Sequence, residues 1–327
     1  MLSVNDVDKI IDSINQNYAI GSQVEISFEA NPGSLNREYL KNLRQSGVNR
    51  LSLGAQSSNP NDLRVLERNH NFIEVIQSMK WARFAGFDNV NLDLIFALPG
   101  QSFPSWQSSL ESALQLDPEH LSLYALSIEH GTPLMNMFNR GLLPLPDPDL
   151  AASMYEWAQK RLRNAGFDHY EISNWARPAR LGEIFSSQHN MQYWRNLPYI
   201  GMGAGAHGWV GGFRTVNVLS PASYIQRMKK QKQHSFPRTS ATLSAKPISQ
   251  KQAMAETMIM GLRLLNEGIS QKDFALRFGH GPDEVYSDQL EDLEDKKLIY
   301  RGGNGGDKLL LTEQAQLVGN QVFSEFV

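Results

Sequence analysis

The chain has 327 residues, of which 41% are hydrophobic and 20% charged, and its formal net charge at pH 7 is −3. This composition can build a sizeable core, which excludes a disordered or fibrous protein, and the small net charge gives no overall field that would attract nucleic acid or an anionic membrane. The absence of cysteine excludes disulfides, thiolate zinc sites, cysteine nucleophiles and any iron–sulfur cluster held by thiolates of this chain.

Strands alternate with helices over the first 135 residues. The hydrophobic pattern predicts a helix that begins after Ser3, a strand that ends at Glu29, and further strands over 50–56, 90–96 and 121–126. Such alternation is typical of βαβ units with a parallel sheet. Because the series opens with a helix, we expect the strand before it to lie outside this chain; the alternative is a helix that covers the edge of the sheet.

The pattern changes after residue 131. We expect a stiff proline-rich connector, a helix over 150–164, an irregular segment over 168–217 and, from residue 253, three helical stretches followed by a hairpin with a glycine-rich tip. The last part resembles a winged helix, but its candidate recognition helix is strongly acidic, which favours packing or partner docking over DNA binding. The predicted division of the chain is 1–135, 136–230, a linker over 231–250, and 251–327.

Polar side chains stand at the carboxyl ends of the predicted strands, where parallel α/β sheets bind ligands. They are Glu29, Gln56, Asp93 and Glu129, and Arg68 lies in the connection after the second strand. Asp93 interrupts an apolar strand, and an inward charge at that position needs a partner. Ion pairs at the rim of the sheet are the alternative for any one residue, but four successive strand ends together indicate a ligand site.

Two histidines in aromatic or glycine-rich surroundings form a second candidate site. His189 lies in the segment Ser-Gln-His-Asn-Met-Gln-Tyr-Trp over 187–194, and His207 ends the glycine-rich segment 201–207. An imidazole beside Tyr and Trp suits axial ligation of a flat aromatic cofactor or stacking beneath it, and a hydrogen-bonded structural histidine is the alternative. Residues 203–208 match G-x-G-x-x-G, but no helical pattern and no suitably spaced acidic residue follow, so we do not expect a dinucleotide fold.

Taken in chain order, these motifs resemble the radical S-adenosylmethionine (SAM) family of oxygen-independent coproporphyrinogen III oxidase-like proteins, and within it the heme chaperone branch, HemW. The resemblance extends over essentially the whole chain. Its motifs lie at residues 29–33 (Glu-Ala-Asn-Pro-Gly), 50–57, 91–95, 98–101 (Leu-Pro-Gly-Gln), 121–124, 128–132, 170–174 (Tyr-Glu-Ile-Ser-Asn), 189–194 (His-Asn-x-x-Tyr-Trp) and 203–207.

The resemblance implies an α/β fold, namely a partial (βα)6 radical-SAM-type barrel whose first strands are missing, with a C-terminal winged-helix-like α+β module. It implies a protein that binds heme and passes it to acceptor proteins such as respiratory enzymes, with SAM and a [4Fe–4S] cluster as cofactors. The positions that match SAM contacts are Glu29, Gln56, Arg68 and Asp93. The heme motif comprises His189, Asn190, Tyr193 and Trp194, with His189 as the candidate ligand of the heme iron.

The chain departs from this family in two motifs. The C-x-x-x-C-x-x-C that holds the cluster and the Gly-Gly-Gly-Thr-Pro loop that binds the methionine moiety of SAM are absent. We therefore expect an N-terminally truncated member and assign no catalytic residue. The alternatives are a porphyrinogen oxidase that uses SAM radicals, which requires the cluster, and a non-catalytic binding protein or fragment.

The expected compartment and partners follow from the same residues. Residues 1–18 lack the basic and apolar regions of a secretory signal, and no apolar run approaches 18 residues, so we expect a cytoplasmic protein without a membrane span. The expected partners are heme and heme-acceptor proteins, with peripheral contact at most to membrane respiratory enzymes and no nucleic acid.

Overall fold

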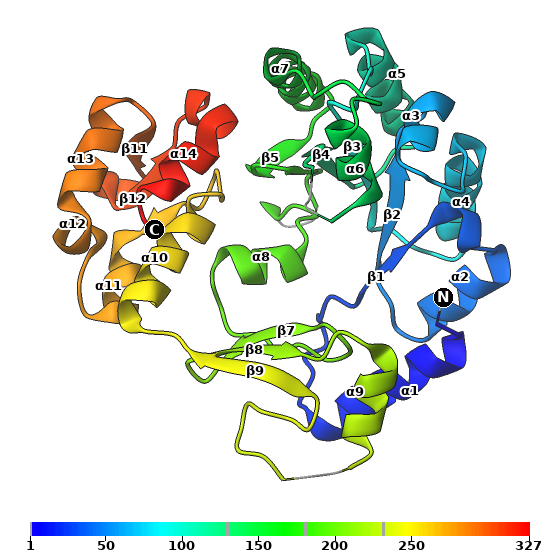
Figure 1. Cartoon of the computed structure of the whole chain (residues 1–327), viewed down its shortest axis with the longest axis horizontal. Helices are drawn as coiled ribbons and strands as arrows, with labels where there is room; N and C mark the ends of the chain where they lie inside the picture. Colours follow the sequence, from blue (N-terminus) through cyan, green and yellow to red (C-terminus); the bar gives the residue numbers. More distant parts are fainter. Residues whose placement is uncertain (1, 129–130, 180–181, 231–232) are drawn as a thin grey trace. The chain divides into compact units, whose positions relative to one another are not determined.

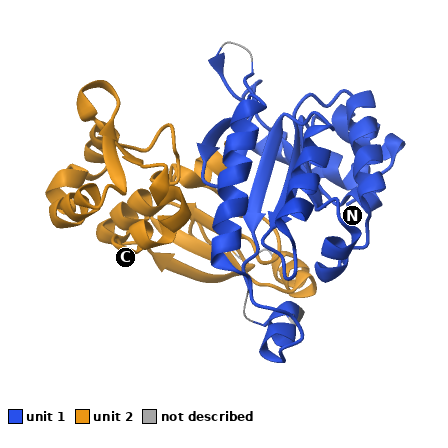
Figure 2. Ribbon diagram, turned by 90° about the horizontal axis from the view of Figure 1, so that it is seen from above, with its two compact units in different colours: residues 1–186 blue, residues 187–327 orange. Residues whose placement is uncertain are grey.

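The structure, a computed structural model, describes residues 2–128, 131–179, 182–230 and 233–327 (Figure 1). The chain divides into two compact units, residues 1–186 and residues 187–327 (Figure 2). We describe each unit separately. The four-part division expected from the sequence stays a prediction.

The first unit contains a six-stranded sheet with the strand order β1-β2-β3-β4-β6-β5. Strands β1 to β4 are parallel, whereas β6 and β5 extend the sheet beyond β4 in antiparallel pairs, so the α/β class and the four predicted parallel strands are confirmed. The elements of this unit are α1 (Val4–Asn17), β1 (Ser27–Ala30), η1 (Pro32–Ser34), α2 (Arg37–Gln45), β2 (Arg50–Gln56), α3 (Pro60–Val65), α4 (Phe72–Phe84), β3 (Val90–Phe96), α5 (Phe103–Leu114), β4 (His120–Ala125), α6 (Pro133–Asn139), α7 (Pro148–Asn164), β5 (Asp168–Glu171) and β6 (Asn174–Ala176).

The core of this unit lies between one face of the sheet and the helices that pack on it. Leu53 of β2 and Leu92 of β3 are fully buried in a cluster that includes Trp106 of α5. Because successive side chains of a strand point to opposite faces, the neighbours of these leucines, such as Ser52 and Asn91, point to the other face. That second face carries the polar residues of the predicted ligand site.

The second unit contains two antiparallel sheets of three strands, with the orders β7-β8-β9 and β10-β12-β11. The strands β11 and β12 form the expected C-terminal hairpin, which follows the helices α10 to α13. The elements of this unit are α8 (Gln188–Trp194), β7 (His207–Val210), β8 (Phe213–Asn217), α9 (Pro221–Met228), β9 (Thr242–Pro247), α10 (Gln250–Gly261), β10 (Ile269–Ser270), α11 (Gln271–Phe278), α12 (Pro282–Val285), α13 (Ser287–Asp295), β11 (Ile299–Gly302), η3 (Asn304–Gly306), β12 (Lys308–Leu311), η4 (Gln314–Val318) and α14 (Gly319–Ser324).

Two segments contain more regular structure than the sequence predicts. The segment 168–217, expected to be irregular, contains β5 to β8 and α8, and the expected linker over 231–250 contains β9. The strand β6 has three residues, all buried, and such a short strand cannot display a two-residue hydrophobic period. These strands are defined by their pairing, β6 with β4 and β9 with β8, which is information that the local sequence does not carry.

Candidate functional site

The inner face of the first sheet carries a row of polar side chains across four strands. Glu29 of β1, Ser52 of β2, Asn91 of β3 and His120 of β4 are successive register partners, so their side chains lie on one face. The carboxylate of Asp93, one pleat further along β3, accepts hydrogen bonds from Ser52 Oγ at 3.0 Å and from Asn91 Nδ2 at 2.8 Å. The inward charge therefore has hydrogen-bond partners, and it lies on the same face of the sheet as Glu29.

His120 is fully buried in this row, and the sequence reasoning did not select it. Its Nδ1 lies 2.6 Å from Asn91 Oδ1, and its Nε2 lies 2.7 Å from the hydroxyl of Tyr170. Burial, together with the nearby Arg50 guanidinium, holds the pKa of His120 well below its ordinary value. The imidazole is thus neutral: Nδ1 donates to the amide oxygen, while Nε2 accepts from the tyrosine, which gives the Tyr-Glu-Ile-Ser-Asn motif a structural role. The sequence does contain a signal that could have identified His120, namely a histidine in an otherwise mostly apolar strand.

The ends of β4 and β5 add a tyrosine and a carboxylate to this edge. Glu171 is fully buried and accepts hydrogen bonds from the backbone N–H of Ser173, at 3.1 Å, and from the side chain of Asn174. Although 41% of Tyr124 is exposed, desolvation of its phenol, and then the negative charges of Asp93, Glu171 and Glu29, raise its pKa to about 12, against a smaller opposite effect of its hydrogen bond with Ser122. The carboxyl edge of the sheet is therefore electronegative.

Gln56 ends β2 in a left-handed conformation, with φ 64°, and its side chain is buried. A Cβ on Gly54 would lie 2.8 Å from Gln56 Nε2, so the glycine leaves room for this side chain to fold back. Arg68, by contrast, has an exposed side chain in the connection after α3. The structure thus places Glu29 and Gln56 at the ends of β1 and β2, Asp93 in the middle of β3 and Arg68 on the segment after α3, while Glu129 lies outside the described residues.

A buried polar cluster behind Gln56 shows what the Leu-Pro-Gly-Gln motif does. The carboxylate of Asp62, in α3, accepts a hydrogen bond from Gln101 Nε2 at 2.8 Å and another from Ser57 Oγ at 2.7 Å. All three side chains are buried, so removing one would leave another without its hydrogen bond. Gln101 therefore positions the segment between Gln56 and Arg68, a role that sequence reasoning did not assign to it.

The unusual environment of Tyr124 predicts a measurable titration. We expect its phenol to deprotonate near pH 12 rather than near 10.0, observed as the difference in phenolate absorbance between the parent chain and Tyr124→Phe. Because the folded state retains the proton longer than the unfolded state, the stability that Tyr124 contributes is complete below about pH 10 and is lost as the pH rises toward 12. Asp93→Asn should lower the pKa of Tyr124, because it removes one of the negative charges that raise it. A difference spectrum that titrates near pH 10 would contradict the assigned environment.

The heme-type motif of the second unit forms the helix α8. Ser187 caps this helix, because its hydroxyl accepts the backbone N–H of Asn190 at 3.3 Å. His189 lies in the first turn with an exposed side chain, and its ring meets the ring of Tyr193, one turn later, edge to face at 4.8 Å. Tyr199 continues this contact, with its ring 4.5 Å from that of Tyr193. We call His189, Tyr193 and Tyr199 the aromatic ladder.

Trp194 lies elsewhere, although it ends the same motif. The guanidinium of Arg263 stacks on its ring at 4.3 Å, and Trp194 lines a cavity of about 560 Å³ with Leu264, which follows α10, and Phe274 of α11. Asn190 is half-buried and supplies the backbone N–H of the cap. The motif therefore has two roles in the structure: His189 and Tyr193 form an exposed ring pair, whereas Trp194 packs against the C-terminal module.

The glycine-rich segment 201–207 is held by side chains of its own unit. Asn217 Nδ2 donates to the carbonyl oxygens of Gly201, at 3.2 Å, and of Gly203, at 3.0 Å, while the backbone N–H of Gly203 donates to the hydroxyl of Tyr224. His207 is exposed and begins β7. A strand follows these glycines rather than a helix, in agreement with the exclusion of a dinucleotide fold.

The described residues contain neither a cluster of metal ligands nor a helix that could cross a membrane. No group of three or more His, Asp or Glu side chains in that part of the chain is arranged to hold a metal ion, and the whole chain contains no cysteine. Within the same residues, no helix has both the length and the apolar character that a membrane crossing requires.

Known proteins match the chain over both units. Residues 3–113 match the Radical SAM superfamily, and residues 248–318 match the HemN C-terminal domain. The heme chaperone HemW of Bacillus subtilis (strain 168) is 38% identical over 327 residues, which cover 100% of this chain and 82% of the relative. The chain belongs to the HemW heme chaperone family. HemW of Lactococcus lactis subsp. lactis (strain IL1403) is 34% identical with the same coverage of both chains, so the family resemblance seen in the motifs is confirmed.

The fold of this HemW-family chain agrees with that assignment. The structure of coproporphyrinogen III oxidase (HemN) from Escherichia coli, which is described as a radical SAM enzyme, superposes with a TM-score of 0.78 over 99% of this chain and 74% of that chain. Its sequence identity is 19%, so the likeness concerns the fold. It confirms the α/β radical-SAM-type unit followed by a C-terminal module.

Proposed function

We propose that this HemW-family protein binds heme on α8 and passes it to acceptor proteins. The observation that carries the proposal is the aromatic ladder, in which the exposed imidazole of His189 meets Tyr193 edge to face at 4.8 Å. A histidine nitrogen is a common axial ligand of heme iron, and tyrosine rings pack against a porphyrin face. The named relatives from Bacillus subtilis and Lactococcus lactis, both heme chaperones, support the same cargo.

The exposure of the ladder suits a chaperone better than a permanent heme protein. His189 stands in the first turn of α8, where the capping hydroxyl of Ser187 holds the helix start and thus the ring pair in place. Burial, and then the neighbouring Tyr199, raise the pKa of Tyr193, so this ring stays a neutral phenol beside the cargo. A heme bound on such a surface keeps one face accessible, and an acceptor can take it over directly.

We also propose that the carboxyl edge of the first sheet contacts SAM through Glu29, Gln56, Asp93 and Arg68. The electronegative edge around Tyr124 fits the ammonium and sulfonium groups and the ribose hydroxyls of SAM. The residues of this chain do not fit a [4Fe–4S] cluster, because the chain has no thiolate to hold one. We therefore derive no radical step, and the proposed activity is heme binding and transfer.

Heme titration of the full chain tests the proposal. We expect a saturable Soret shift at one heme per chain, and transfer of that heme to apomyoglobin as an acceptor probe. Asp93→Asn should bind heme as the parent does, because Asp93 belongs to the other unit. A Soret change that never saturates, or one that Asp93→Asn removes, would contradict heme binding on α8. We propose that the protein acts in the cytoplasm and that its acceptor proteins are respiratory enzymes.

A further inference from the structure

A second cavity of the second unit has a lining unlike that of the cavity beside Trp194. It has a volume of about 580 Å³ and is lined by the end of α9, by residues 234–240 and by the start of β9. Three cationic side chains line it, together with an imidazole and hydroxyl groups, and none of the described residues that line it is a carboxylate. The lining residues are Arg227, Lys230, His234, Arg238, Thr239, Ser240, Thr242, Leu243 and Ala245.

The three cations of this cavity have no acidic partner among the residues that the structure describes. Among the described residues, Arg227, Lys230 and Arg238 make no ion pair, whereas arginines elsewhere in the chain, such as Arg83 and Arg301, do. In a chain with more acidic than basic residues, three neighbouring cations without a carboxylate leave a local positive charge. An anionic ligand would balance it.

The loop that carries Arg238 is ordered by its own hydrogen bonds. The backbone N–H of Thr239 donates to Thr242 Oγ1 at 2.8 Å, and the backbone N–H of Ala241 donates to Thr239 Oγ1 at 3.2 Å. Ala241 is fully buried, and its carbonyl oxygen accepts the backbone N–H of Val218. The cavity wall is therefore anchored to the sheet β7-β8-β9, and Arg238 extends from a defined turn.

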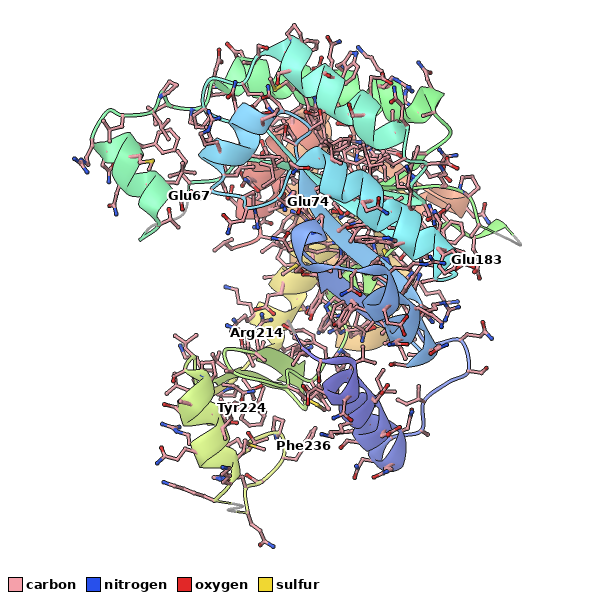
Figure 3. All side chains as sticks on the ribbon, turned by 90° about the vertical axis from the view of Figure 1, so that its right-hand side faces the viewer. Glu67, Glu74, Glu183, Arg214, Tyr224 and Phe236 are labelled. Atoms are coloured by element: carbon pink, nitrogen blue, oxygen red, sulfur yellow. The ribbon has the colours of Figure 1, made fainter. Side chains whose placement is uncertain are left out.

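We infer that this cavity binds a phosphate-bearing anion. Guanidinium groups match phosphate oxygens in paired hydrogen bonds, an ammonium adds charge, and hydroxyls donate to the remaining oxygens. The volume falls within the range of roughly 300–1,000 Å³ that is usual for ligand sites, so it exceeds the need of a single small ion. Two exposed apolar side chains belong to the same part of the chain: Phe236, in the loop after α9, is 69% exposed (Figure 3), and Leu243, which lines the cavity, is 61% exposed. The phosphate group can thus come from a free polyphosphate or from a lipid headgroup.

Two probes on the full chain distinguish these sources. Isothermal titration with pyrophosphate tests the free anion, and flotation with vesicles of phosphatidylcholine and phosphatidylglycerol tests the headgroup. One of the two probes should bind the parent chain. We expect Arg227→Gln/Arg238→Gln to weaken the binding of that probe at least about tenfold, because each lost charge-assisted hydrogen bond costs roughly that factor or more. Added salt should weaken it as well.

Matched variants separate the cavity from charge in general. Lys251→Gln/Lys272→Gln removes two exposed cations of the same unit outside the cavity, and His189→Ala alters the aromatic ladder; both should bind the probe as the parent does. If circular dichroism shows that the double arginine variant is unfolded, the single substitution Arg238→Gln, at an exposed residue, replaces it in the binding test. The inference is overturned if neither probe binds, if binding survives in the arginine variants, or if the lysine variant loses it equally.

Discussion

Replacing His189 with alanine is expected to weaken heme binding at least about tenfold and to shift the Soret band toward that of heme without a protein axial ligand. The loss of an iron–nitrogen bond removes more than the ~1.4 kcal/mol that a factor of ten requires. The fold should be unaffected, because the side chain is exposed in the first turn of α8 and the cap depends on Ser187. Absorbance titration with heme, at constant pH, measures both effects.

Other histidines of the second unit provide the controls for this experiment. His280 lies outside α8, and its exposed imidazole contacts Glu284. His280→Ala should therefore leave the heme affinity unchanged. His207→Ala tests the other histidine that the sequence selects, which begins β7. If His207→Ala abolishes the Soret shift and His189→Ala does not, the heme ligand is His207 and the assignment to α8 is wrong.

Replacing Gly201 with alanine is expected to destabilise the second unit by about 3 kcal/mol or more. A Cβ at this position would lie 1.9 Å from the carbonyl oxygen of His207 and 2.5 Å from its carbonyl carbon. Both are backbone atoms of a paired strand, so no side-chain rotation relieves the overlap, and the backbones must separate. Urea unfolding followed by circular dichroism measures the change in the free energy of unfolding.

The same substitution should also disturb the aromatic ladder. Tyr199 lies two residues before Gly201, and its backbone pairs with Trp209 of β7, so a displacement of this segment moves the Tyr199 ring away from Tyr193. Gly281→Ala is the matched control, because a Cβ there meets nothing closer than 3.8 Å, and it should change the free energy of unfolding by less than about 1 kcal/mol. Equal stability of Gly201→Ala and the parent would show that the close approach is misplaced.

The architecture of the first unit was largely predictable from the sequence. Hydrophobic periodicity identified the four parallel strands, and polar residues at their ends, such as Glu29 and Gln56, indicated the edge that parallel sheets use for ligands. The hydrogen bonds behind that edge were not predictable. Asn91 and His120 are 29 residues apart, and only the register of β3 against β4 makes them partners.

In the second unit the sequence showed the motifs but not the arrangement of their side chains. Its motifs were conspicuous in the sequence, yet their spacing does not reveal that Tyr193 contacts His189 while Trp194 stacks on Arg263. Residues four apart on a helix share a side, so a seven-residue helix separates neighbours of one motif onto different surfaces. Likewise, a net charge of −3 does not reveal that Arg227 and Arg238 line one cavity.

The sequence by itself determined the family, the alternation of strands and helices, and the absence of thiolates for a cluster, because these depend on residue identity and local order. The tertiary structure decided which polar side chains meet, where the cations gather and which glycines admit no side chain. These properties depend on strand register and loop packing, which bring together residues that are distant in the chain, and no local pattern encodes those pairings.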